Sequence, residues 1–492
     1  MVNGSSHPMG AANGWSPSGA EPTAAPTATL VPIQSEHIPV IELDFEQVRL
    51  LQGQLADALT AVPGFRSMSP EDQRQRARSE VANLVASWAG RYAQAHRRTI
   101  TPADQRAYEQ AVLDRHFGAG RLQPLLDDES VENIFVNGAN DVWIDRGNGK
   151  LQQVAPVAAS DTELIELLNT LGRNHGGGER QVSTSNPLLS MRLADGSRVQ
   201  VITEAVPRPH VTIRRHRTLH VTLARLVELG MIDRSLHAFL AAAVRARMTI
   251  MVVGGQGVGK TSLMRALLSE VPQDERVATL ETEYELYLHE DGFHTQVVPL
   301  ETRQGNGEIL DGRQVGEITL ADLIPPALRM SLSRLIVGEV RGAEIVPMLS
   351  AMTSSEGGSM CTLHVKRGDQ TFRRIAMLCQ QYSTLTEELA FSLAADALDL
   401  IVHVRAWDET GIGGKKHRFV SEVLEVTGIG ENNRPATNVI FGPTETEPRA
   451  VPRTTPSPQL LAALQRAGFD GRWLDQKGGA WDAPLETKMT VV

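Results

Sequence analysis

Apolar residues near the N-terminus recur at helical spacing. One stretch predicts a helix over residues 44–62 that ends at Pro63-Gly64, through Phe45, Val48, Leu51, Leu55 and Leu59. Two more helices are predicted to begin at Ser69-Pro70 and at Thr101-Pro102, because each pair places a capping hydroxyl before a proline at the first helical position. The third helix is expected to end at Phe117-Gly118. Residues 44–118 are therefore expected to form a helical segment, whose Arg-rich polar faces are either solvated surface or a binding site.

The pattern then changes to short alternating runs. Strands are predicted between residues 131 and 154, with turns at Asn137-Gly138 and Gly147-Asn148-Gly149. A helix over residues 161–174 is followed by the breaker Gly176-Gly177-Gly178, and further strands are predicted at 188–193, 198–203 and 211–214. We expect residues 119–220 to form a small α/β domain, joined to the next domain near residues 216–225.

A third pattern begins with the apolar run 248–253, which leads through a glycine-dense turn into the amphipathic run 262–268. Further apolar runs at 276–280, 334–337 and 359–363 alternate with helical stretches. This alternation predicts an α/β domain over residues 221–430 with a mostly parallel, covered sheet.

Both ends of the chain are expected to be tails. Residues 1–43 are rich in Gly, Ala, Ser, Pro and Thr and are predicted to be disordered. The strand signal fades beyond Leu424, so residues 431–492 are interpreted as a tail with one short helix over 459–467.

Composition narrows the class of protein. The chain has 492 residues and a formal net charge of -10, which disfavours bulk attraction to nucleic acid. No apolar run approaches the roughly 20 residues of a membrane span, and the N-terminus lacks a signal-peptide pattern, so we expect a cytosolic protein. Cys361 and Cys379 match neither a metal-site nor a disulfide spacing, which favours a reducing compartment.

The glycine-dense turn carries the strongest chemical signal. Residues 254–261, GGQGVGKT, fit G-x-x-x-x-G-K-[ST], in which backbone amides and a helix N-terminus surround an anion. Lys260 is expected to reach the β- and γ-phosphates, and the Thr261 hydroxyl to join a Mg²⁺ shell. The predicted nucleotide contacts in this loop are Gly254, Gly255, Gly257, Val258, Gly259, Lys260, Thr261 and Ser262. The alternative is a glycine-rich turn that binds nothing.

Two acids and a histidine follow other apolar runs. Glu339 comes just past 335–338, Glu281 just past 277–280, and His364 just past 361–363. The carboxyl ends of parallel strands line the ligand crevice of an open α/β sheet, where an acid can hold Mg²⁺ or orient water. The alternatives are an ion pair between Glu339 and Arg341, a structural role for Glu281, and a packed hydrogen-bonding role for His364.

Three arginines lie on or beside strands of the smaller α/β domain. Arg198, Arg214 and Arg215 have apolar neighbours, and a guanidinium in such a place usually meets an anion. Surface salt bridges are the alternative.

In this order the motifs resemble the type II and type IV secretion ATPase superfamily, most closely its CpaF-like branch, which powers tight-adherence pili. The matching segments are LLDDESVENIFVNG (125–138), DGSRVQ (195–200), VTIRR (211–215), GGQGVGKT (254–261), TLETEYEL (279–286), ALRMSLSRLIVGEVRG (327–342) and AMTSSEGGSMCTLHV (351–365). The last four stand where the family has Walker A, the Asp box, an atypical Walker B and the His box.

The resemblance implies a RecA-like P-loop ATPase domain with a smaller α/β N-terminal domain preceded by a helical segment. It implies a hexameric ring that couples hydrolysis of MgATP to pilus assembly or secretion, with nucleotide between the two domains of a protomer. Glu339, Glu281 and His364 become candidate catalytic residues, Thr261 and Glu339 candidate Mg²⁺ ligands, and Arg198, Arg214, Arg215 and Arg303 candidate phosphate contacts. The partner implied is an inner-membrane platform protein at the inner face of the cytoplasmic membrane, with no direct nucleic-acid contact.

Several positions depart from the family pattern. Thr282 stands where the Asp box has an aspartate, Glu356 replaces the first histidine of the His box, and Leu332-Ser333 replaces the usual Pro-Asp before Walker B. The segment 304–314 suggests a loop of altered length. Losing an acid beside Mg²⁺ and adding one near the γ-phosphate are expected to weaken turnover if both contact the site. Two rival functions therefore stay open: a nucleotide-binding scaffold with weak hydrolysis, and a hexameric nucleic-acid motor.

Overall fold

The computed structural model describes residues 43–488 except 148–149, 176–181, 185–186, 194, 216–220, 304 and 306–308. The predicted N-terminal tail, apart from Leu43, lies outside the described residues, as do the Gly176-Gly177-Gly178 breaker and the end of the Gly147-Asn148-Gly149 turn.

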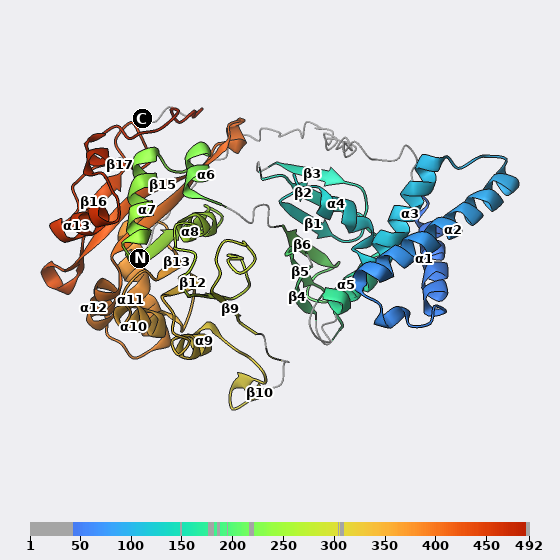
Figure 1. The fold of residues 1–492 in the computed structure, drawn as a ribbon, viewed down its shortest axis with the longest axis horizontal. Coiled ribbons are helices and arrows are strands. Elements are labelled where there is room, and N and C mark those ends of the chain that lie inside the picture. The colour runs from blue at the N-terminus through green and yellow to red at the C-terminus, as the bar shows by residue number, and fades with distance from the viewer. Residues whose placement is uncertain are drawn as a thin grey trace, which may run out of the picture.

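The three predicted N-terminal helices are present as α1 (Phe45–Thr60), α2 (Pro70–His96) and α3 (Pro102–Phe117). The Ser69 side chain caps α2, and Thr101 forms a reciprocal capping box with Asp104 at α3. The apolar stripes of these helices pack on one another in a core of their own, which includes Leu55 and Val85. Figure 1 shows this bundle at the opposite end of the molecule from the larger sheet.

The smaller α/β domain follows the bundle through the short helix α4 (Gln123–Asp127). Its strands are β1 (Asn133–Asn137), β2 (Val142–Asp145), β3 (Leu151–Val154), β4 (Leu188–Arg192), β5 (Arg198–Ile202) and β6 (His210–Arg214). They are ordered β3-β2-β1-β6-β5-β4 with every neighbouring pair antiparallel. Helix α5 (Asp161–His175) contributes Leu164, Leu168 and Leu171 to the core beneath the sheet.

The larger sheet is ordered β17-β16-β15-β14-β7-β13-β12-β8-β9. Its strands are β7 (Ile250–Gly254), β8 (Val277–Glu281), β9 (Val297–Glu301), β12 (Arg334–Val340), β13 (Met360–His364), β14 (Leu400–Asp408), β15 (Lys416–Ile429), β16 (Pro435–Gly442) and β17 (Val451–Pro452). The run from β14 to β9 is parallel, as predicted, whereas β15 to β17 extend it antiparallel.

Helices cover both faces of this sheet. They are α6 (Leu223–Glu228), α7 (Arg234–Arg245), α8 (Lys260–Leu268), α9 (Leu320–Ala327), α10 (Ile345–Thr353), α11 (Thr371–Tyr382), α12 (Glu387–Ala397) and α13 (Pro458–Arg466). Ile250 and Val252 of β7 belong to one core, with α7, α8 and α13, while Met251 and Val253 belong to the other, with α9 to α12. This sandwich confirms the predicted RecA-like α/β class.

The C-terminal residues correct the prediction of a tail over 431–492. β16 and β17 are strands of the larger sheet. The predicted short helix is present as α13, and its Leu464 is buried in the core of the larger domain. The Phe239 ring of α7 lies 5.1 Å from the Phe441 ring and 5.6 Å from that of Phe469, measured between centroids. The sequence signal was weak because only the last residues of β16 are buried, so its first half lacks an apolar face.

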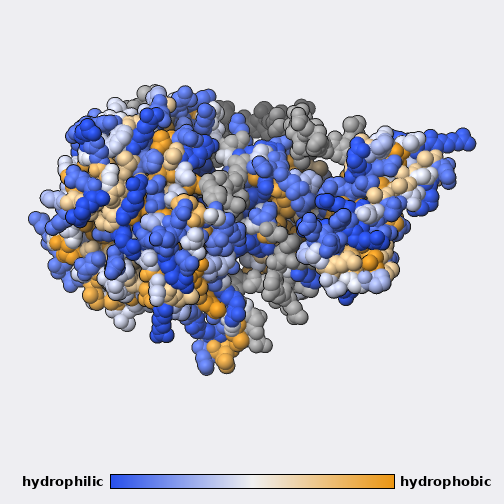
Figure 2. All heavy atoms as spheres, in the orientation of Figure 1, coloured by the Kyte–Doolittle hydropathy of each residue, from blue (hydrophilic) through white to orange (hydrophobic). Residues whose placement is uncertain are grey.

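The segment predicted as a loop of altered length contains the small hairpin β10 (Ile309–Leu310) and β11 (Arg313–Gln314). Ile309 and Leu310 are 75% and 67% exposed, and Figure 2 shows apolar surface at the hairpin that projects below the larger sheet in Figure 1. Within the described ranges, no helix combines the length and apolar character needed to cross a membrane.

Candidate functional site

The glycine-dense turn joins β7 to α8 at the carboxyl edge of the larger sheet. Gly254, Gly257 and Gly259 have backbone φ values of 157°, 69° and 101°, which residues other than glycine rarely adopt. A Cβ atom on Gly254 would lie 2.4 Å from the Val404 carbonyl oxygen. The loop therefore requires its glycines, and the N-terminus of α8 opens onto the space above them.

Lys260, the first residue of α8, folds back over this loop. Its Nζ donates to the Gly255 carbonyl at 2.8 Å and lies 3.1 Å from His364 Nδ1. Burial lowers the pKa of Lys260 to about 8. A phosphate beside this ammonium would stabilise its charged form and raise the pKa again.

His364 ends β13, directly beside Gly254 in the parallel register. Its Nε2 pairs with Glu339 Oε1, and burial together with the nearby Lys260 charge lowers the pKa of His364. A neutral imidazole that accepts from Lys260 at Nδ1 carries its proton on Nε2, toward Glu339. His364 thus connects the loop lysine to the acid of the next strand.

Glu339 lies where the register of β12 against β13 shifts, between Val337 and Val340. Its Oε2 pairs with Arg341, as the alternative interpretation predicted, while its other oxygen faces His364. A Cβ atom on the preceding residue, Gly338, would lie 3.0 Å from Glu281 Cγ, so a larger residue there would push against the Glu281 side chain. Glu339 is thus brought to the same edge as the phosphate loop.

Glu281, at the end of β8, is turned inward and is 2% exposed. Its Oε1 accepts from the backbone amides of Glu285 and Leu286, both at 2.9 Å, and burial raises its pKa to about 7. These contacts support the turn that follows β8. The geometry favours the structural role for Glu281, which was the alternative interpretation.

Two acids that the sequence analysis did not select complete the site. Glu285 Oε2 accepts from the Thr261 hydroxyl at 3.0 Å, and its Oε1 accepts from Arg198 Nη1 at 2.9 Å. Glu283 pairs with Arg198 Nε. The signal that could have found them is the alternation of acids in Glu281-Thr282-Glu283-Tyr284-Glu285, directly after a buried strand.

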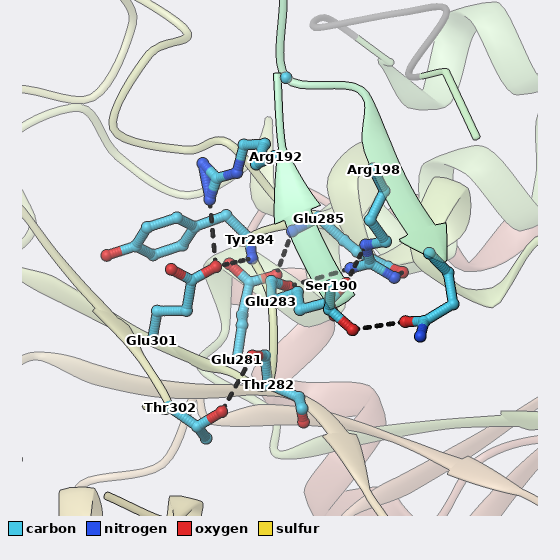
Figure 3. Close-up of polar contacts among 12 residues, drawn as sticks. Ser190, Arg192, Arg198, Glu281, Thr282, Glu283, Tyr284, Glu285, Glu301 and Thr302 are labelled. Carbon is cyan, nitrogen blue, oxygen red and sulfur yellow. Dashed lines mark hydrogen bonds and ion pairs between the residues drawn. The ribbon is translucent and has the colours of Figure 1, made fainter. Parts of the chain in front are cut away.

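A pocket of about 80 Å³ lies between the smaller domain and the larger sheet. Figure 3 shows Arg198 beside Glu283 and Glu285, three of the residues that line it. Its lining residues are Arg198, Thr261, Glu281, Thr282, Glu283, Glu285, Gly338, Glu339 and Arg341. Arg198 comes from β5, so the pocket is completed by the smaller domain. Within the described residues, no group of three or more His, Cys, Asp or Glu could hold a metal ion by itself.

The other predicted phosphate contacts lie elsewhere. Arg214 is exposed on β6, and Arg215 Nη1 pairs with the carbonyls of Asp128 and Val131 within the smaller domain. Arg303 Nε donates to the Gly316 carbonyl at 2.6 Å. Glu356 is exposed on the segment that follows α10. Of the four predicted arginines, the structure brings only Arg198 to the pocket.

Comparison with known proteins places this geometry in a family. The family model described as type II/IV secretion system protein matches residues 116–411. A protein of Mycobacterium tuberculosis, provisionally named a conjugal transfer protein, is 32% identical over 304 residues, which is 60% of this chain and 82% of the relative. The type IV secretion system protein VirB11 of Brucella suis is 28% identical over 331 residues, 61% of this chain and 87% of the relative.

Among solved structures, the VirB11 ATPase of Brucella suis with sulphate has a TM-score of 0.32 at 28% identity, covering 64% of this chain and 96% of that one. The family match spans the smaller domain, the phosphate loop and the strand-end acids together. The chain belongs to the type II/IV secretion ATPase superfamily, whose members are ATP-hydrolysing enzymes.

Proposed function

We propose that this chain is a ring-forming ATPase that couples hydrolysis of MgATP to the movement of protein subunits in a pilus-assembly or secretion machine of the CpaF-like kind. One observation carries the proposal. Glu285 joins Thr261 of the phosphate loop to Arg198 of the smaller domain, so the contents of the pocket can act on the position of that domain.

Binding of the triphosphate begins with partner exchange. Lys260 leaves the Gly255 carbonyl for the β- and γ-phosphates, and the loop amides of residues 255–261 surround the same anion. Arg198 then exchanges Glu283 and Glu285 for phosphate oxygens. The smaller domain follows its arginine, which is the mechanical step of the proposal.

Hydrolysis is assigned to the strand-end pair. Glu339 is the group that orients the attacking water, with the His364 imidazole against one oxygen of its carboxylate. Arg341, which pairs with the other oxygen of Glu339, must turn away from it for Glu339 to accept a proton.

The pocket also fits Mg²⁺, since it offers the Thr261 hydroxyl and several carboxylates, and Mg²⁺ usually takes one or two protein oxygens plus phosphates. Thr261 and Glu339 would hold it, and it would neutralise charge on the phosphates. The Thr261 hydroxyl donates a hydrogen bond to Glu285, so the lone pairs of the Thr261 oxygen stay available to the ion.

The assembly proposed is a hexamer in the cytoplasm, held at the inner face of the cytoplasmic membrane by an inner-membrane platform protein, without direct contact to nucleic acid. What supports it is the family match and the arrangement of the pocket between two domains.

The test is steady-state ATP hydrolysis by the purified, assembled protein, with Glu339→Gln as the inactive control and Lys260→Ala as the binding control. We expect turnover in the wild type, a loss of at least about a hundredfold in Glu339→Gln, and lost nucleotide binding in Lys260→Ala. If Glu339→Gln hydrolysed ATP as fast as the wild type, Glu339 would not be the catalytic acid. Unchanged nucleotide affinity in Lys260→Ala would remove the phosphate-loop assignment.

A scaffold with weak hydrolysis is the second candidate, and specific contacts favour it. Glu339 is held by both Arg341 and His364, and Thr282 carries no acid. Tight MgATP binding without turnover, even with the membrane partner present, would support it. Stimulation of turnover by DNA would instead revive the nucleic-acid motor.

A further inference from the structure

A second arginine of the smaller domain reaches the larger one beside the pocket. Arg192 ends β4 and stands opposite Arg198 of β5 in the antiparallel register. Directly opposed residues project from the same face of a sheet. Figure 3 shows both guanidinium groups directed at the turn that follows β8.

The contacts of Arg192 differ from those of Arg198. Arg192 Nη2 donates to Glu301 Oε1 at 3.1 Å, and the same oxygen accepts from the Tyr284 amide at 2.9 Å. The guanidinium carbon lies 4.6 Å from the centroid of the Tyr284 ring and 5.6 Å from that of Tyr287. Arg192 is therefore held by an ion pair and by aromatic faces at once.

Tyr287 extends this contact in both directions. Its hydroxyl donates at 2.9 Å to the carbonyl of Gly196, in the turn that joins β4 to β5. Its ring also lies 5.4 Å from the guanidinium carbon of Arg265, on the phosphate-loop helix α8. The β4–β5 hairpin is thus fastened to the larger domain by Arg192 and Tyr287, next to the helix that begins at Lys260.

These fastenings lie outside the pocket. Arg192, Tyr284, Tyr287 and Glu301 are not among the residues that line it, whereas both acids paired with Arg198 are. Phosphates that enter the pocket compete with the two acids for Arg198, but they do not reach the contacts of Arg192, which lie outside the pocket. One arginine of the hairpin can change partners while the other keeps its own.

We propose that Arg192 is a positioning residue for the ATPase reaction. Its contact with Glu301 and the two tyrosines is the pivot about which the smaller domain turns when Arg198 passes from acids to phosphate. The inference rests on the proposed function, since it assumes that the pocket takes nucleotide. The simpler alternative is a surface salt bridge of no consequence, because both side chains are about one-third exposed.

The test uses Arg192→Gln, with Glu301→Gln as its partner variant and Arg472→Gln as a matched control. Glutamine at 301 can still accept from the Tyr284 amide, so this variant removes only the charge that faces Arg192. Arg472 pairs with Asp470 and is far more exposed, at 87% of its side chain. Arg192→Lys keeps the charge and serves as the conservative variant.

Two readouts separate positioning from folding. The first is the KM for ATP against kcat. The second is the distance distribution between spin labels on Thr212→Cys and Gln380→Cys, two exposed positions in the smaller and larger domains. Cys361 and Cys379 are buried, so labelling is directed to the introduced sites.

We expect Arg192→Gln to raise KM about three- to tenfold with little change in kcat, and to broaden the distance distribution without nucleotide. Glu301→Gln should do the same, the double variant should be no worse than either single one, and Arg192→Lys should recover most of the loss. Arg472→Gln should match the wild type.

Wild-type KM and an unbroadened distribution in Arg192→Gln would overturn the pivot. Additive effects of the two substitutions would also overturn it, because they would show that the two side chains act separately. Failure of the proposed function is distinguishable, since it appears as unchanged nucleotide affinity in Lys260→Ala. The nucleotide-free distance measurement does not depend on turnover.

Discussion

Glu283 places a carboxylate in the pocket even though Thr282, the residue before it, has none. The sequence shows an acid missing at Thr282, but the structure places the next carboxylate along the chain in the pocket, paired with Arg198. A nucleotide must separate this pair before its phosphates can reach the guanidinium. Glu283 therefore competes with the substrate for Arg198.

Replacing this acid should tighten binding. We predict that Glu283→Gln, which keeps the size but removes the charge, raises the affinity for ATP in the absence of Mg²⁺ about three- to tenfold. Isothermal titration calorimetry with a chelator present measures this. Glu228→Gln, an exposed acid paired only within α6, is the control and should bind as the wild type does. Weaker binding by Glu283→Gln would mean that the carboxylate supports the site rather than opposing it.

At the scale of elements, the turn after β8 depends on one buried carboxyl group. Burial raises the pKa of Glu281 to about 7, above its ordinary value of 4.5. The folded state therefore favours the protonated form, and the stability that this group contributes is full below about pH 4.5. It is lost as the pH rises toward about 7, since the folded state then has to ionise a buried acid.

Glu281→Gln should remove this pH dependence while keeping an acceptor for the amides of Glu285 and Leu286. We predict that its free energy of unfolding, relative to wild type, increases between about pH 4.5 and 7 and is level above that range. The slope is at most about 1.4 kcal/mol per pH unit. Urea unfolding at several pH values measures it, and parallel curves for the two proteins would contradict the assignment.

Most helices and strands could be predicted from the sequence because their signals are local. α2 and α3 have a capping hydroxyl followed by proline, and β8, β12 and β13 are short buried apolar runs. The alternation of acids after β8 marks Glu283 and Glu285 in the sequence but does not say what they bind. Their roles depend on Arg198, which lies more than 80 residues away in the chain. Arg214, Arg215 and Arg303 stay predictions as phosphate contacts. A motif gives a position on or beside a strand, but not the carbonyl that a side chain such as Arg215 or Arg303 binds.

At the scale of the whole molecule, the cores are separate. The buried apolar clusters of the N-terminal bundle, the smaller domain and the larger domain share no member within the described ranges. Each can therefore lose packing energy without direct loss in the others. What connects the smaller and larger domains near the pocket is polar: the pairs of Arg192 and Arg198, and the Tyr287 hydroxyl.

The C-terminal helix allows this separation to be tested, because leucines in two cores can be shortened identically. Leu464 of α13 and Leu55 of α1 are both fully buried, the first in the larger domain and the second in the bundle. We predict that Leu464→Ala destabilises the larger domain by about 2–5 kcal/mol, the usual range for a buried leucine truncated to alanine. Scanning calorimetry should show the transition that nucleotide stabilises moving to lower temperature.

Leu55→Ala should lower a different transition, one that nucleotide does not shift, and should leave nucleotide affinity unchanged. If residues 431–492 formed the tail predicted from the sequence, Leu464→Ala would leave stability unchanged. If the cores were coupled, the two variants would lower the same transition by similar amounts. If Leu464→Ala lowers only the unfolding transition that nucleotide stabilises, the larger sheet depends on α13 for its stability. The N-terminal bundle then unfolds independently of the larger domain.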